Sequence, residues 1–240
     1  MSTLNFYFDP VCPFAWMTSQ WVRSVARQRK YAVEWRFISL RLLNANVDYD
    51  AQFPPGYEAG HTAGLRLLRV AARTRDEHGP DAVGALYEAL GHRIFDSPPP
   101  DEGAEGVDPP GTAAFLRPVL TEVGLPQSLS EALEDDTWDA VVSTETDEAL
   151  DLAGRDVGTP ILHFDPPEGV AFFGPVISRL PAEEEAVALW DHVLGLVRFP
   201  GFAELKRSLR ERPQLRAMGV AEEEIGVTED WHEGSRRTHW

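Results

Sequence analysis

The chain has one cysteine in 240 residues, Cys12, and it is the first place to look for chemistry. Cys12 follows a short apolar segment at residues 4–8 and directly precedes Pro13, a residue type that favours the first position of a helix. A helix N-terminus carries about half a positive charge and unpaired N–H groups, and both favour a thiolate. Cysteines in such positions have pKa values lowered from ~8.5 into the ~3.5–7.5 range. We therefore expect an acidic, nucleophilic Cys12.

The competing interpretation is that Cys12 is a small buried hydrophobic residue, the commonest role of a lone cysteine. Its place between a strand-like and a helix-like segment argues against this interpretation. A Thr159-Pro160 pair directly before a later strand-like run also argues against it. With no second cysteine the chain cannot form an internal disulfide, and this fits a reducing cytoplasm.

The elements that position Cys12 begin with a strand, a helix and a strand. Residues 4–8 are apolar, residues 14–29 have apolar residues at helical spacing, and residues 31–38 alternate apolar with charged side chains. This order predicts a parallel strand pair. Helical patterns follow at 57–77, 81–95, 112–124 and 137–154. A hairpin is expected at 161–164 and 170–173, followed by a helix at 182–197.

These patterns predict an α/β core interrupted by a helical insertion. We assign residues 1–44 and 155–206 to the core and residues 45–154 to an all-helical subdomain. Residues 97–111 are rich in proline, glycine and acidic residues and predict a mobile loop within that subdomain. Residues 207–240 form a C-terminal tail that we expect to be partly disordered.

Composition restricts the partners. The net charge of −17 is spread along the chain, so nucleic acid and anionic membranes are not expected to bind. The N-terminus lacks the features of a signal peptide, and no apolar run is long enough to span a membrane. The histidines and the single cysteine show no spacing typical of a metal site. The sequence leaves the oligomeric state open, a homodimer included.

Several segments together resemble a known family. The run FDPVCPFAW at 8–16 resembles the active-site turn of the DsbA-like thioredoxin superfamily, and VGTP at 157–160 resembles its cis-proline loop. SLRLLN at 39–44, GHRI at 91–94 and FFGPV at 172–176 resemble the actinobacterial branch that includes mycothiol-dependent nitroreductases. The similarity covers residues from about 4 to 206.

The resemblance implies a thioredoxin-like fold with a helical insertion and a cis Thr159–Pro160 peptide that faces the cysteine. It implies a cytoplasmic oxidoreductase with no tightly bound cofactor, which uses a low-molecular-weight thiol, mycothiol in this branch, as cosubstrate. A nitroaromatic or quinone-like compound would be the small aromatic substrate.

The resemblance also implies further site residues. Thr159 and Pro160 would offer backbone groups to a bound thiol, next to Pro13. Phe14, beside the thiol, would line a pocket for aromatic substrates, although core packing explains it equally well. The branch contributes pocket residues at the positions where this chain has Asn44 and Tyr57. His92 is a further candidate, because it lies in a helix expected near the cysteine.

One departure from the family pattern affects the mechanism. The dithiol motif Cys-x-x-Cys has Ala15 at its fourth position here, so a mixed disulfide at Cys12 must be resolved by an external thiol. A single nucleophile is also typical of the kappa-class glutathione transferases and 2-hydroxychromene-2-carboxylate isomerases, and that chemistry is an alternative. A second alternative is a degenerate scaffold that binds a ligand without turnover.

Overall fold

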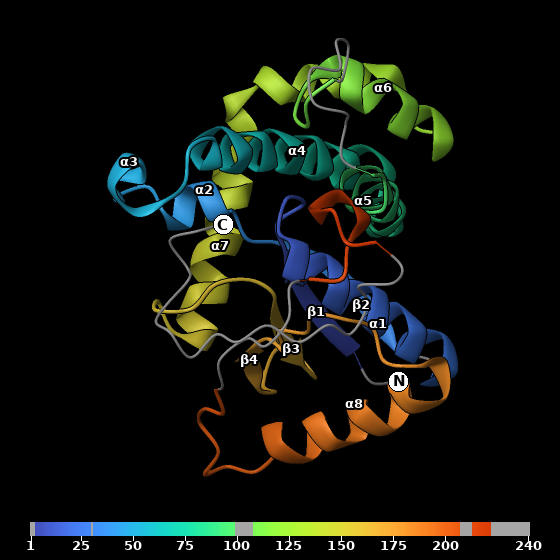
Figure 1. Ribbon diagram of the computed structural model, residues 1–240, viewed down its shortest axis with the longest axis vertical. Coiled ribbons are helices and arrows are strands. Elements are labelled where there is room, and N and C mark those ends of the chain that lie inside the picture. The colour runs from blue at the N-terminus through green and yellow to red at the C-terminus, as the bar shows by residue number, and fades with distance from the viewer. Residues whose placement is uncertain (1–2, 30, 99–107, 207–212, 222–240) are drawn as a thin grey trace.

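The computed structural model describes residues 3–29, 31–98, 108–206 and 213–221 (Figure 1). The predicted mobile loop at 97–111 falls largely on residues 99–107, which lie outside the described residues. The predicted disorder of the tail likewise concerns residues 207–212 and 222–240, outside the described part of the chain.

A four-stranded mixed sheet lies at the centre, with the strand order β2-β1-β3-β4. Strand β1 (Thr3–Phe8) runs parallel to β2 (Ala32–Phe37), as the strand–helix–strand pattern predicts. Strand β3 (Ile161–Phe164) is antiparallel to β1 and forms the predicted hairpin with β4 (Ala171–Phe173). A late segment of the chain is thereby brought beside the strand that leads into Cys12.

Two helices that are distant in sequence pack together beside this sheet. Helix α1 (Pro13–Arg29) leads away from Cys12. Helix α8 (Glu183–Val197) lies at the end of the molecule opposite α4 (Tyr57–His78), α5 (Pro80–Phe95) and α6 (Ala113–Glu122) (Figure 1). The Trp21 indole donates a hydrogen bond to the Ala186 carbonyl at 2.9 Å, and its ring meets Trp190 edge to face at 5.5 Å. Large buried aromatic side chains therefore join α1 to α8.

The described chain between β2 and β3 is helical. The longer helices agree with the predicted ranges to within a few residues, whereas the sequence patterns do not predict two four-residue helices after β2. The elements are α2 (Leu40–Leu43), α3 (Tyr49–Gln52), α4 (Tyr57–His78), α5 (Pro80–Phe95), α6 (Ala113–Glu122), η1 (Gln127–Glu134), η2 (Asp136–Trp138) and α7 (Asp139–Ala153). The subdomain boundaries at 44/45 and 154/155 stay a prediction. After α8, the short η3 (Arg216–Met218) follows Leu215, which is buried in the core.

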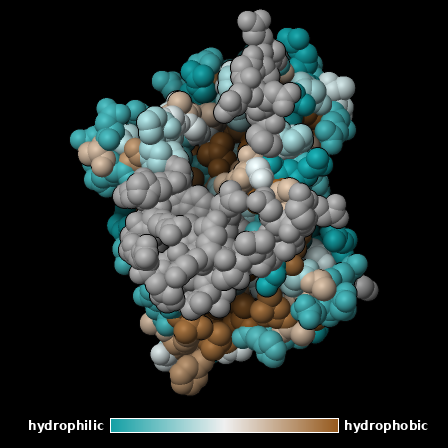
Figure 2. Space-filling model, viewed as in Figure 1, coloured by the Kyte–Doolittle hydropathy of each residue, from teal (hydrophilic) through white to brown (hydrophobic). Residues whose placement is uncertain are grey.

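The outer surface of α8 is partly apolar. Figure 2 shows hydrophobic residues at the surface of this end of the molecule, where Leu196 is 44% exposed and Phe199 is 65% exposed. No helix in the described ranges is both long enough and apolar enough to cross a membrane.

Helix α5 approaches the core through two glycines. A Cβ added at Gly91 would overlap the Trp16 ring, and one added at Gly84 would lie 2.8 Å from the Trp35 ring. Both approaches are closer than van der Waals contact allows. Glycine at these two helical positions thus lets α5 lie directly on the aromatic side chains next to the active-site turn.

We predict that Gly91→Ala destabilises the protein by several kcal/mol, on the order of the larger overpacking penalties, because the rigid Trp16 ring cannot move away from the added methyl group. Gly195→Ala is the matched control, since Gly195 lies inside α8 with nothing within 4 Å of an added Cβ. This control should be neutral or stabilising by up to about 1 kcal/mol. Denaturant unfolding of both variants measures the difference, and equal stabilities would contradict the packing described here.

Candidate active site

The Cys12 thiol lies between the start of α1 and the loop before β3. Its Sγ accepts a hydrogen bond from the Ala15 N–H at 3.4 Å and donates one to the Thr159 carbonyl at 3.6 Å. The Thr159–Pro160 peptide is cis. The Trp16 N–H donates to the Cys12 carbonyl at 3.0 Å, so the helical hydrogen bonds begin at the cysteine itself. The structure therefore brings together the two segments that the sequence resemblance paired.

The prediction that the Cys12 thiol is acidic is wrong for the folded protein. The pKa of Cys12 is raised to about 12, chiefly because burial disfavours the thiolate. The hydrogen bond from Ala15 opposes this rise, and the charge of Asp9 adds to it. Only 6% of Cys12 is exposed. The local sequence reveals the helix start, but the burial depends on distant segments of the chain.

Asp9, three residues before Cys12, is a buried acid that no sequence pattern predicts. Its Oδ1 accepts a hydrogen bond from the Val11 N–H at 3.0 Å, and its Oδ2 accepts one from the Leu40 N–H at 2.8 Å. The side chain is fully buried. Burial raises the pKa of Asp9 to about 7, while the two N–H groups oppose the rise. The carboxyl group thus ties the turn before Cys12 to the start of α2.

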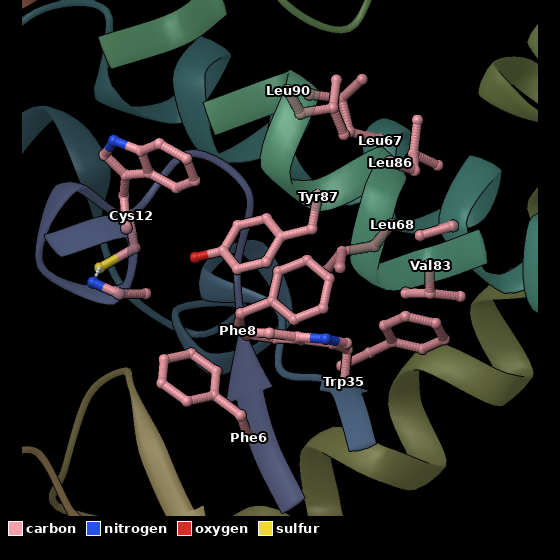
Figure 3. Close-up of a cluster of buried hydrophobic side chains, with 14 of the residues drawn as sticks. Phe6, Phe8, Cys12, Trp35, Leu67, Leu68, Val83, Leu86, Tyr87 and Leu90 are labelled. Atoms are coloured by element: carbon pink, nitrogen blue, oxygen red, sulfur yellow. Dashed lines mark hydrogen bonds between the residues drawn. The ribbon is translucent and has the colours of Figure 1, made fainter. Parts of the chain in front are cut away.

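Buried aromatic rings from β1, α1 and α5 pack together on the inner side of the site. Tyr87 of α5 stacks on Phe8 with 3.9 Å between the ring centroids, and it meets Trp16 edge to face at 5.9 Å. Figure 3 shows Tyr87 between Cys12 and the Phe8–Trp35 pair, with its hydroxyl directed to the Cys12 side. Burial raises the pKa of Tyr87, so its hydroxyl stays protonated. These rings keep water from the inner side of the thiol.

His92 is linked to the active-site turn through Asp96 and Trp16. Its Nδ1 lies 2.7 Å from Asp96 Oδ2, while Asp96 Oδ1 accepts a hydrogen bond from the Trp16 indole N–H at 3.2 Å. The His92 ring also meets the Trp16 ring edge to face at 5.1 Å. Trp16 is fully buried, whereas half of the His92 side chain is exposed. His92 is therefore anchored to the helical turn that follows Cys12, with its Nε2 free of these contacts.

Asn44 has a local structural role. Its Nδ2 donates a hydrogen bond to the Leu40 carbonyl at 2.8 Å at the end of α2. Pro13 and Phe14 are half-buried, and Phe14 packs against the main hydrophobic core. The binding roles of these three residues stay predictions.

Tyr57 begins α4 within a cluster of rings. It stacks on Phe53 at 5.4 Å and meets His61 edge to face at 5.8 Å, and it is half-buried. Tyr57, His61 and Gly64 share one helix face at the spacing i, i+4, i+7. A Cβ at Gly64 would lie 2.5 Å from Asp9 Oδ1, so this face of α4 is directed at the turn before Cys12.

Some of these groups leave signals in the sequence. Asp9 directly follows an apolar strand, but the sequence indicates only that it belongs to the turn that ends the strand. Gly64 and Gly91 lie inside helical patterns, but so does Gly195, which has nothing within 4 Å of an added Cβ, so the patterns do not single out the two close approaches. The partnership of Asp96 with Trp16 joins residues 80 positions apart, and no spacing rule could have found it. The described residues contain no group of three or more His, Cys, Asp or Glu side chains placed to hold a metal ion.

The family model of the mycothiol-dependent nitroreductase Rv2466c matches residues 11–207. The chain belongs to the Rv2466c-like family. The uncharacterised protein Rv2286c of Mycobacterium tuberculosis is 33% identical over 209 residues, which cover 86% of this chain and 82% of that protein.

Solved structures show the same fold at low sequence identity. A candidate protein disulfide isomerase of Nitrosomonas europaea superposes with a TM-score of 0.50 and 13% identity, over 81% of this chain and 98% of that one. A 2-hydroxychromene-2-carboxylate isomerase superposes with a TM-score of 0.52 and 15% identity, over 82% of this chain and 96% of that one. The predicted fold class, a DsbA-like thioredoxin fold, is confirmed. Membership of the family indicates an enzyme of the thiol-disulfide oxidoreductase type.

Proposed function

We propose that the protein is a cytoplasmic oxidoreductase in which Cys12 alone forms a mixed disulfide with a low-molecular-weight thiol, namely mycothiol. The observation that carries the proposal is the position of the Cys12 sulfur between a helix-start N–H and the Thr159 carbonyl, in a chain without a second cysteine. Mycothiol is supported by membership of the Rv2466c-like family. The cytoplasm is supported by the family and by the lone thiol.

The proposed cycle balances with two molecules of thiol, RSH. The Cys12 thiol and the first RSH together deliver two electrons and two protons to a quinone, forming the hydroquinone and Cys12–S–S–R. With a nitroaromatic substrate the products are the nitroso compound, water and the same mixed disulfide. A second RSH then attacks as its thiolate, releasing RSSR and restoring the Cys12 thiol. No second protein thiol takes part.

The proposal of an aromatic substrate is supported by the rings at the start of α4. Tyr57, at the start of α4, stacks with Phe53 in a half-buried cluster, on the helix face that meets the turn before Cys12 at Gly64. Planar apolar compounds favour such surfaces. His92, which Asp96 links to Trp16, is half-exposed, and its Nε2 is a ring nitrogen to which an incoming thiol can bind.

One observation favours a second candidate, the ligand-binding scaffold without turnover. The pKa of Cys12 is raised to about 12 and the thiol is buried, which leaves little thiolate at neutral pH. A scaffold would bind the aromatic ligand and leave both thiol and ligand unchanged.

The test is reduction of a 1,4-quinone and of a nitroaromatic by reduced mycothiol, with glutathione as the comparison thiol and Cys12→Ser as the control variant. We expect mycothiol disulfide and reduced substrate to form together, and only with the natural cysteine. A thioether conjugate as the product would instead indicate transferase chemistry. Ligand binding with no consumption of either thiol would support the scaffold and overturn the proposal.

A further inference from the structure

The active-site turn contains two acids in one buried region without a balancing cation. Asp9 is fully buried and Cys12 is almost so. The ion pairs found in the described part of the chain join no Lys, Arg or His to Asp9. The carboxyl group instead rests on the N–H groups of Val11 and Leu40, and the thiol rests on that of Ala15. Two neighbouring acids in a region of low dielectric cannot both ionise readily, because each charge opposes the other.

We propose that Asp9 is a positioning residue whose ionisation opposes that of Cys12, so that the Cys12 thiol ionises more readily while Asp9 is protonated. Asp9 would act through the cysteine and would not touch the substrate. This inference rests on the proposed function for its meaning, since it identifies the group that controls when Cys12 can attack.

The groups that face Asp9 support this coupling. The charge of Asp9 raises the pKa of Cys12 beside α1, of Tyr49 on α3 and of Tyr87 on α5. Both tyrosines have pKa values raised mainly by burial, and they stay neutral hydroxyls. From α4, Gly64 contacts the carboxyl group without any side chain, and His61 hydrogen-bonds to the Tyr49 hydroxyl at 2.8 Å. Burial and Arg41 lower the pKa of His61, so it supplies no positive charge there at neutral pH.

Coupling of this kind has a characteristic pH dependence. The pKa of Asp9 is raised to about 7. Below it, Asp9 is protonated, and the thiolate population rises tenfold for each pH unit. Above this pKa, the dominant state has an ionised Asp9 and a neutral thiol. The state with a thiolate and a protonated Asp9 binds the same number of protons, so its population relative to the dominant state does not change with pH. The thiolate population therefore stops rising just above pH 7. It rises again at higher pH, once the thiolate forms mainly beside ionised Asp9, with the curve displaced by the size of the coupling.

The experiment is alkylation of Cys12 by iodoacetamide from pH 5 to pH 10, followed by intact mass. The single cysteine makes every modification a modification of Cys12. We expect the rate in the natural protein to flatten into a shoulder just above pH 7 and to rise again by pH 9. In Asp9→Asn the rates should match the natural protein below pH 6, continue to rise above pH 7, and be about tenfold higher by pH 9 for a coupling of one pKa unit.

A structural role alone would give a different result. An Asn at position 9 turns its NH₂ group toward one of the two N–H donors, so Asp9→Asn is also expected to unfold more easily. General loosening, however, would speed alkylation by a similar factor at every pH. Asp48→Asn is the matched control, because Asp48 also accepts a backbone hydrogen bond, at the start of α3 and on the surface. This control should keep the flattening near pH 7.

Two outcomes overturn the proposal. The first is a natural protein whose alkylation rate rises without a break through pH 7, and this measurement does not depend on any variant that fails to fold. The second is an Asp9→Asn profile parallel to that of the natural protein. Because alkylation needs neither mycothiol nor turnover, these outcomes are distinguishable from failure of the proposed oxidoreductase function.

Discussion

Cys12→Ala is expected to abolish thiol-dependent reduction and mixed-disulfide formation completely. The chain has no other sulfur nucleophile, so the loss should reach the background of the uncatalysed reaction rather than a fraction of the natural rate. The change removes one sulfur from a site held by two hydrogen bonds at 3.4 and 3.6 Å. The measurement is substrate reduction with mycothiol, with circular dichroism to confirm folding.

Cys12→Ser is the companion variant, because it keeps the size and the hydrogen-bonding capacity of the side chain. A hydroxyl cannot form a disulfide, so this variant should also lose redox activity. If it gained or kept a thiol-conjugating or isomerising activity, the kappa-class alternative would replace the proposed function. Full reductase activity in Cys12→Ala would show that Cys12 is only a packed core residue.

Ala15→Cys is expected to convert the persistent mixed disulfide into a short-lived one. Residues three apart at a helix start have Cβ atoms about 5–6 Å apart, close enough for a disulfide after a small adjustment. The introduced thiolate would attack Cys12–S–S–R, form an internal disulfide with Cys12 and release RSH. Ala15 is fully buried, so the larger side chain should cost about 1–3 kcal/mol of stability.

The lifetime of the adduct is measured by intact mass after removal of free thiol. Ala15→Ser adds a side chain of similar size and controls for the packing cost, and its adduct should persist as in the natural protein. An Ala15→Cys adduct that is as long-lived as that of Ala15→Ser would contradict the idea that the missing second cysteine determines the fate of the mixed disulfide.

Most of the fold follows from the sequence, because its long elements have strong periodicity. The patterns at 57–77 and 81–95 predict α4 and α5 almost to the residue. Helices α2 and α3 are not predicted, because four residues make little more than one turn and show no helical period of apolar residues. Their N-cap residues, Ser39 and Asp48, are the signals that remain, and each side chain accepts a backbone N–H of its own helix.

The site is predictable only in part. The pairing of Cys12 with Thr159 follows from the family resemblance, and the structure places the two groups in contact. The pKa of Cys12 is predicted in the wrong direction, because the helix start is a local feature and burial is a tertiary one. The burial of Asp9 is not predicted for the same reason. A carboxyl group after a strand is ordinary in sequence, and only α2 and α4 make it a buried acid.

Mixed-disulfide formation at Cys12 is measured as the intact mass of the natural protein after incubation with oxidised mycothiol and, separately, with oxidised glutathione. We expect a single adduct per chain, whose mass exceeds that of the natural protein by one mycothiol less two hydrogens, with one reduced mycothiol released. This adduct should form faster than that with glutathione, and it should disappear with excess small thiol. An unmodified mass under conditions in which the unfolded chain is fully modified would contradict this mechanism, because Cys12 would then be present but inert in the folded protein.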